Sequence, residues 1–201
     1  MMKRISMKNA RTRKIVMTGM LAAVSTVLMM LSFSVPLMPS FIKMDFSELP
    51  ALIAAFSMGP LSGVAVCLIK NLFNLFFTTT GGVGELANFL LGVSFVLPAG
   101  VLYRIRHDRR TAFWAAMGGA FLMGLFSLPL NYFLTYPVYS NFLPLEVIIG
   151  MYQAILPGVD GLLMCLLVFN VPYTFLKGVI VTLLTFLVYK HISPLIKGAR
   201  T

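Results

Sequence analysis

Long apolar segments alternate with short polar ones along the chain, with a spacing typical of helices that cross a membrane. We predict six such helices: 14–34, 47–58, 61–78, 85–103, 111–136 and 172–190. The second is short, because its 12 residues rise only about 18 Å as a helix, against a hydrocarbon core of about 30 Å. Gly59 and Pro60, which together break helices, separate it from the third.

The basic residues support this division and orient it. Thirteen of the 16 Lys and Arg residues fall in three clusters, at 3–14, 104–110 and 190–200. Lys and Arg collect on the cytoplasmic side of a membrane. Joining 47–78 into one helix would place the second cluster outside, so we predict a tight cytoplasmic turn at Gly59-Pro60.

Segment 143–171 is apolar enough to suggest a seventh crossing, but that crossing would export the C-terminal basic cluster. Pro144, Pro157, Gly158 and Asp160 also interrupt it. We therefore expect a long outer loop with one or two short helices. The predicted fold is an all-α integral membrane protein, a six-transmembrane-helix bundle with both termini cytoplasmic and long outer loops between helices 1 and 2 and helices 5 and 6.

The composition indicates a single membrane domain over residues 1–201. The chain is 59% hydrophobic and 11% charged, with a mean hydropathy of +0.91, which is typical of a polytopic helical membrane protein. We expect basic cytoplasmic tails at 1–13 and 191–201 around a bundle at 14–190. A net charge of +10 also suits nucleic acid, but clustering at the ends of spans favours topology, and no nucleic-acid partner is expected.

A few polar residues interrupt the apolar segments, and in this orientation nearly all of them fall in the outer half of the membrane. They are Lys70, Asn71, Asn74, Glu85, Asn88, Asn131, Tyr132, Thr174 and Lys177, with Lys43, Asp45 and Glu48 in the first outer loop. Unpaired polar groups are costly in lipid, so we expect these side chains to face one another or a ligand.

Structural roles compete with binding roles for several of these residues. Asn74, Asn88 and Asn131 are equally suited to hydrogen bonds between helices, and Lys70 can pair with Glu85.

For the charged residues near the second and sixth helices, structural and binding roles also compete. Asp45 and Glu48 can favour the N-terminus of the second helix, with Ser47 as its cap, although Asp45 precedes the cap and is freer to meet a ligand. Lys177 lies a turn below the outer end of its helix beside Thr174, and for this lysine we favour binding.

Motifs of several function classes are absent from the sequence. It has no G-x-x-x-x-G-K-[ST] phosphate loop, no H-E-x-x-H zinc motif and no inverted repeat of broken helices. The histidines, His107 and His191, lie in basic flanks, and Cys67 and Cys165 lack metal-ligand spacing. We expect no catalytic site, metal or cofactor, and a dependence on partners for energy.

Five motifs occur in order within residues 14–190: Phe41-Ile-Lys-Met-Asp45-Phe-Ser-Glu-Leu-Pro50, Gly59-Pro60-Leu-Ser-Gly63, Lys70-Asn-Leu-Phe-Asn74, Leu130-Asn-Tyr-Phe133 and Pro172-Tyr-Thr-Phe-Leu-Lys-Gly178. Together they resemble the riboflavin-specific substrate-binding (S) subunit of energy-coupling factor (ECF) vitamin transporters. The resemblance implies a six-helix membrane bundle, an outward-opening vitamin pocket covered by the first loop, and no catalysis in this subunit.

The resemblance also implies which residues hold the flavin. In the family, an Asn of helix 5 and an Asn-x-x-Lys pair at the start of helix 6 hold the ring system, which corresponds here to Asn131, Thr174 and Lys177. Thr174 departs from the Asn that is common there, since a threonine keeps one donor and one acceptor but lacks the reach of an amide.

A flavin needs apolar walls for its flat ring and a few aimed polar groups for its polar edge and its ribityl hydroxyls. We predict that walls are provided by Phe41, Met44, Phe46 and Tyr132. We predict that Asp45 or Asn74 binds the ribityl hydroxyls.

The expected partners are riboflavin, the lipid bilayer, a membrane coupling (T) subunit and two cytosolic ATPase subunits, in a bacterial plasma membrane. Small residues at helical spacing on the first helix, Gly19, Ala22, Ala23 and Thr26, predict a docking surface for another helix, with packing inside this bundle as an equal alternative.

Two other functions stay open at this point. Thr174 suits a binding subunit for another vitamin or for a flavin such as FMN. A small integral-membrane enzyme acting on lipids is less favoured, because the cytoplasmic side offers only basic residues with Asp108 and His107.

Overall fold

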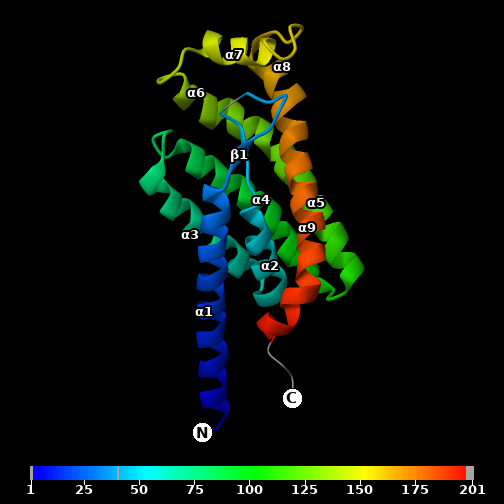
Figure 1. Ribbon diagram of the computed structural model, residues 1–201. Helices are drawn as coiled ribbons and strands as arrows, with labels where there is room; N and C mark the ends of the chain where they lie inside the picture. The colour runs from blue at the N-terminus through cyan, green and yellow to red at the C-terminus, as the bar shows by residue number, and fades with distance from the viewer. Residues whose placement is uncertain (1, 40, 198–201) are drawn as a thin grey trace.

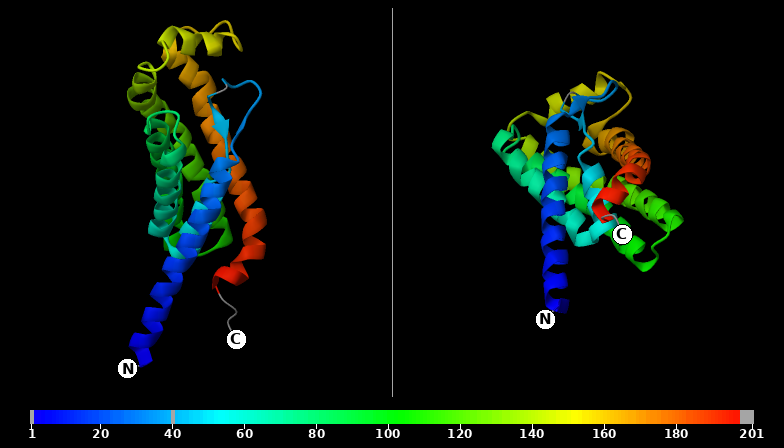
Figure 2. Two further views of the ribbon diagram at one scale, coloured as in Figure 1. Left: turned by 60° about the vertical axis from the view of Figure 1, so that its left-hand side comes forward. Right: turned by 60° about the horizontal axis from the view of Figure 1, so that its bottom comes forward.

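The computed structural model describes residues 2–39 and 41–197, and its long helices run roughly lengthwise through the molecule (Figure 1). In chain order the elements are α1 (Met2–Met30), β1 (Phe33–Ser34), β2 (Lys43–Met44), α2 (Glu48–Met58), α3 (Pro60–Asn74), η1 (Leu75–Phe77), α4 (Val83–Ile105), α5 (Arg109–Leu130), η2 (Asn131–Thr135), α6 (Tyr136–Tyr139), α7 (Leu145–Gln153), α8 (Gly161–Cys165), η3 (Leu166–Asn170) and α9 (Val171–Lys197). The start of α1 and the end of α9 lie at the same end of the molecule, and α7 lies across the opposite end (Figures 1 and 2).

Five helical runs are long and apolar enough to cross a membrane. They are Arg11–Met30, Pro60–Phe77, Val83–Ile105, Arg109–Tyr139 and Gly161–Val188. The prediction of a helical protein with membrane-length helices is therefore confirmed. The shorter apolar helix α2 has 11 residues, so the count of six crossings, their orientation and the sides of the loops stay predictions.

The two segments that were predicted as basic tails are largely helical in the structure. The first helix extends back to Met2 and ends at Met30, so most of the expected tail at 1–13 continues the helix. At the other end α9 continues to Lys197, and residues 198–201 of the expected tail, like Met1, lie outside the described residues.

α9 begins at Val171, beside the predicted start at residue 172, but the helical run to which it belongs starts earlier than predicted. The helix begins at Gly161 and continues through Pro172, so the loop predicted at 143–171 contains α7 and ends before α8. Proline normally stops a helix because it lacks an N–H and leaves a carbonyl of the preceding turn without a partner. Here the π-helical turn η3 precedes it, and the N–H of Val171 donates to the carbonyl of Leu166, five residues back. This wider turn shifts the hydrogen-bond pairing and accommodates the proline.

The Gly59-Pro60 turn and the burial of α2 agree with the sequence. Gly59 has a φ of 102° and separates α2 from α3, a conformation that favours glycine. Residues 51–55 of α2 are at most 1% exposed, and the helix packs against α1, α3, α4 and α9. A helix that is apolar on all sides belongs in the interior of a protein, which is where α2 lies.

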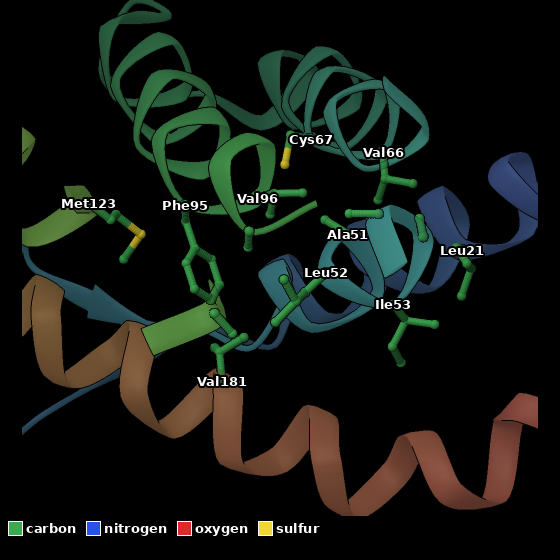
Figure 3. Packing of buried hydrophobic residues seen from close by; sticks show 14 of the residues in the cluster. Leu21, Ala51, Leu52, Ile53, Val66, Cys67, Phe95, Val96, Met123 and Val181 are labelled. Atoms are coloured by element: carbon green, nitrogen blue, oxygen red, sulfur yellow. The ribbon is translucent and has the colours of Figure 1, made fainter. Parts of the chain in front are cut away.

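The core around α2 draws side chains from most of the long helices (Figure 3). Leu52 and Ile53 of α2 meet Val66 of α3, Phe95 of α4 and Val181 of α9 in one buried cluster. Members of the cluster come from α1, α2, α3, α4, α5 and α9, so one apolar core holds these six helices together.

Glycines allow α4 and α5 to approach closely. A Cβ atom at Gly119 would overlap the carbonyl oxygen of Phe95 and lie 3.2 Å from its ring carbon Cδ2. The preceding Gly118 is exposed, and a Cβ atom there would have no neighbour within 4 Å.

We predict that Gly119→Ala lowers the thermal unfolding midpoint of the detergent-purified protein, with a loss of about 1–3 kcal/mol typical of overpacking. Gly118→Ala is the matched control and should leave the midpoint unchanged or raise it slightly, because alanine favours a helix. Equal midpoints for the two variants would show that the α4–α5 contact is less tight than described.

Candidate functional site

A cavity of about 560 Å³ is lined by β2, by the C-terminal ends of α1 and α3 and by the first turns of α4 and α9. These parts of the chain lie in the half of the molecule away from the termini (Figure 1). Its volume is within the range of small-molecule pockets. Of the nine predicted binding residues, six line it: Phe41, Asp45, Asn74, Asn131, Thr174 and Lys177. The structure thus gathers residues that are up to 136 positions apart in the sequence around one space.

The other three predicted wall residues do not line the cavity. Met44 is buried beside the exposed Lys43, because successive side chains of a strand point to opposite faces. Phe46 packs against the core, with its ring centroid 6.0 Å from that of Phe33. Tyr132 is 39% exposed, since one residue along a helix from Asn131 turns the side chain away from the cavity.

Two lysines and two carboxylates form a buried network at one side of the cavity. Lys177 Nζ lies 2.9 Å from Asp45 Oδ2 and 3.1 Å from Glu48 Oε2. Lys70 Nζ donates to Glu48 Oε1 at 2.8 Å and also to Ser47 Oγ. Ser47 in turn donates through its N–H and its hydroxyl to Asp45 Oδ1. The network joins α3, α9 and the start of α2 to the segment that follows the hairpin.

Its charges neutralise one another, which matters because its members are almost fully buried. Lys70 is 0% exposed and Glu48 is 2% exposed. A buried charge is tolerated when it is paired and hydrogen-bonded, and removing one partner leaves an uncompensated charge. Burial raises the pKa of the Asp45 carboxyl, but the ammonium groups of Lys177 and Lys70 outweigh burial and hold that pKa below its usual value.

Two of the structural alternatives considered above are wrong in detail. Lys70 pairs with Glu48 and not with Glu85. Ser47 occupies the N-cap position of α2 but makes no capping hydrogen bond through its side chain, which takes part in the ionic network instead. The position of Glu48 in the first turn of α2 is as predicted, yet its carboxylate serves the two lysines.

Glu85 lines a different part of the cavity and is bound by neutral donors. Its Oε1 accepts from Asn74 Nδ2 at 3.0 Å, and its Oε2 accepts from the hydroxyls of Thr78 at 2.8 Å and Thr80 at 3.2 Å. Asn74, predicted as a ligand for hydroxyls, therefore reaches the cavity already bonded to this carboxylate.

A hydrogen-bonded group of aromatic residues closes the cavity on the side of α7. The hydroxyl of Tyr152 donates to Asn170 Oδ1 at 2.7 Å and also bonds the hydroxyl of Tyr136. The ring of Phe41 meets the rings of Tyr136 and Tyr152 edge to face, with centroids 6.3 and 6.0 Å away. Phe41, which lines the cavity just before β2, is thereby fixed by contacts with α6 and α7.

The cavity residues that were not predicted include three polar ones, Thr135, Asn170 and Tyr173. The hydroxyl oxygens of Thr135 and Tyr173 are buried and have no hydrogen-bond partner among the residues that the structure describes. Thr135 lies four residues after Asn131, and Asn170 lies four residues before Thr174, so helical spacing was the available signal. The mistaken helix start at residue 172 concealed Asn170 and its position on this face.

Both π-helical turns border the cavity. η2 carries Asn131 and Thr135, and η3 ends at Asn170. Within residues 2–39 and 41–197, no group of three or more His, Cys, Asp or Glu side chains is placed to hold a metal ion. The polar groups present are amides, hydroxyls, lysines and carboxylates, which suit an organic ligand with a polar edge and hydroxyl groups.

The four predicted docking residues on α1 separate into two environments. Gly19 and Ala23 are exposed, and a Cβ atom at Gly19 would have no neighbour within 4 Å. Ala22 is 1% exposed and belongs to the core, so it follows the alternative of packing inside the bundle. Thr26 is half-buried and donates to the carbonyl of Ala22.

Comparisons with known proteins point to one family. A family profile described as "ECF transporter, substrate-specific component" matches residues 13–189. The chain is 29% identical to the riboflavin transporter RibU of Staphylococcus aureus, over 93% of this chain and 94% of that protein. It is 30% identical to the riboflavin transporter FmnP of Bacillus subtilis, over 95% of this chain and 97% of that protein.

A solved structure agrees with these relatives. It is described as the structure and mechanism of the S component of a bacterial ECF transporter, and it superposes with a TM-score of 0.73 at 29% identity. The match covers 94% of this chain and 99% of that one. The proteins found are transporter components and not enzymes, so the alternative of a lipid-modifying enzyme is excluded.

We predict that Lys70→Met, which removes a charge from the buried network, lowers the stability of the purified protein by about 3–5 kcal/mol. The control is Lys43→Met, an exposed lysine whose loss should change stability by less than about 0.5 kcal/mol. Thermal unfolding in detergent measures both. A Lys70→Met protein as stable as the control would show that the network does not hold the bundle together.

Proposed function

Because the chain belongs to the family of ECF transporter substrate-specific components, we propose that it is the high-affinity riboflavin-binding subunit of an ATP-driven vitamin importer. Riboflavin is then cargo, taken from outside the cell, and the subunit needs no cofactor of its own. The observation that carries the proposal is a cavity that is lined by Asn131, Thr174 and Lys177 together.

The groups around this cavity suit the polar edge of an isoalloxazine ring. Lys177 has three N–H donors and donates one hydrogen bond, to Asp45 Oδ2; its contact with Glu48 Oε2 at 3.1 Å is an ion pair without a hydrogen bond. At least one donor is therefore left for a ring carbonyl. Asn131 donates through Nδ2 to the carbonyl of Ser127 at 2.8 Å, which leaves its amide oxygen free to accept from a ring N–H.

Two unpaired hydroxyls add to the binding capacity of the cavity. Thr135 and Tyr173 carry buried hydroxyl oxygens without a partner in the described part of the chain. Buried polar groups are normally hydrogen-bonded, so these two are suited to bond a ligand. They line the same cavity as Thr174, so they can provide hydrogen bonds in place of the amide contact that an asparagine at position 174 would make.

In the transport cycle that we propose, the cavity opens on the outer side of a bacterial cell membrane and both termini lie in the cytoplasm. The short helix α2 is then the second of six membrane crossings. In this orientation the β1–β2 hairpin and the α3–α4 connection lie on the external side. A membrane coupling subunit and two cytosolic ATPases reorient the loaded subunit and release riboflavin inside. The chain itself contains no phosphate-binding loop, in keeping with hydrolysis by partners.

For the coupling subunit we propose docking on α1 through the exposed stripe formed by Gly19 and Ala23. Small residues four positions apart let a second helix approach closely. Ala22, which packs inside the bundle, has no part in this stripe.

We predict that Asn131→Ala weakens riboflavin binding about 10- to 100-fold, the range expected when a buried hydrogen bond to a ligand is lost. Quenching of riboflavin fluorescence by purified protein measures the affinity. The matched control is Asn141→Ala, since Asn141 is exposed and bonds only the carbonyls of Pro137 and Val138. Wild-type protein that neither binds nor quenches riboflavin would overturn the proposed function.

We also predict that Ala23→Leu abolishes riboflavin uptake by cells while the purified variant binds riboflavin as the wild type does. Val24→Leu, at the neighbouring exposed position on another side of α1, is the control and should retain uptake. If Ala23→Leu cells take up riboflavin normally, the coupling subunit docks elsewhere.

A further inference from the structure

Charged side chains are distributed unevenly around the cavity. Three carboxylates line it, those of Asp45, Glu48 and Glu85. Asp45 and Glu48 are neutralised by lysines at 2.8–3.1 Å. Glu85 has only Asn74, Thr78 and Thr80 as partners, and within the residues that the structure describes no lysine or arginine pairs with it.

Glu85 and the lysine network reach the cavity from different sides. Every partner of Glu85 belongs to the end of α3 or to the connection from α3 to α4. Lys177 comes from α9, which packs on α5 and α2. In all three views of Figures 1 and 2, the α3–α4 connection and α9 lie on opposite sides of the bundle. The cavity therefore has one side with balanced charge and one side with a negative charge.

This arrangement orients a flavin. Ring carbonyls are acceptors and suit the free N–H of Lys177, whereas ribityl hydroxyls are donors and suit a carboxylate. With the ring at the Lys177 side, the ribityl chain extends toward Glu85. The terminal 5′ position then lies where its substituent meets an uncompensated negative charge.

We infer that Glu85 determines specificity by admitting the neutral ribityl chain of riboflavin and rejecting flavins that carry a 5′-phosphate. This inference rests on the proposed function and names a property of the same cavity. A phosphate monoester carries close to two negative charges at neutral pH, and like charges brought together in a cavity that excludes water repel each other strongly. Lys43 also lines the cavity, but it is exposed, so solvent and salt screen its attraction for a phosphate.

The test compares the dissociation constants of riboflavin, FMN and lumiflavin, a flavin without the ribityl chain, for wild-type protein and Glu85→Gln. Glutamine keeps the size of the side chain and removes its charge. Its amide oxygen can still accept from Asn74 Nδ2, and its NH2 group can donate to the hydroxyl of Thr78 or Thr80, which are able to reverse their roles. We expect the ratio of the FMN constant to the riboflavin constant to fall by roughly tenfold or more in Glu85→Gln, with lumiflavin unchanged. Glu146→Gln, which removes an exposed carboxylate of α7, is the control and should leave the ratio unaltered.

A second measurement needs no variant and separates charge from size. A neutral 5′-ester of riboflavin is about as bulky at the 5′ position as FMN, so wild-type protein should bind it far more tightly than FMN if charge decides. Equal rejection of the ester and FMN, equal binding of riboflavin and FMN by the wild type, or an unchanged ratio in Glu85→Gln would each overturn the inference. Failure of the proposed function is distinct, because the wild type would then bind no flavin.

Discussion

The pairing of buried charges is the constraint on which the rest of this structure depends. Lys70, Glu48, Lys177 and Asp45 are almost fully buried in a protein that is mostly apolar, and each is tolerable there only because the others lie within 2.8–3.1 Å or are linked through Ser47. This requirement brings α3, α9 and the start of α2 to fixed positions relative to one another. It also holds the segment after the hairpin against α9, so the cover of the cavity and its wall are joined by the same interaction.

The division of the polar groups into satisfied and unsatisfied ones then indicates what the cavity can bind. The lysine network is neutral as a whole, and the carboxylate of Glu85 accepts three hydrogen bonds of the about four that its two oxygens can take. The hydroxyls of Thr135 and Tyr173 are buried and unpaired in the described part of the chain. A ligand that brings both donors and acceptors on an apolar frame completes such a site, whereas a purely apolar ligand leaves the hydroxyls without partners.

The sequence was sufficient for the elements but not for the directions of individual side chains. The apolar segments and the Gly59-Pro60 pair located α2, α3 and α4 to within a few residues, because both reflect strong constraints of membranes and of backbone geometry. The first helix begins at Met2 and not at 14, and the last helical run begins at Gly161 and not at 172. Six of the nine predicted ligand residues line the cavity. Met44, Phe46 and Tyr132 do not, since one step along a strand or helix reverses or rotates a side chain. The partner of Lys70 was mistaken because Glu48 comes close only through the packing of α2 against α3.

The error at Pro172 has a physical cause that bears on the cavity itself. Each π-helical turn is followed two residues later by a proline: η2 ends at Thr135 before Pro137, and η3 ends at Asn170 before Pro172. The N–H of the residue just before each proline bonds a carbonyl five residues back, that of Asn131 in one case and that of Leu166 in the other. A widened turn lets a helix continue through a proline, and it also rotates the preceding residues relative to a regular helix. In both helices the rotated residues include a cavity-lining asparagine, so the same local irregularity that keeps these helices long also directs an amide toward the cavity.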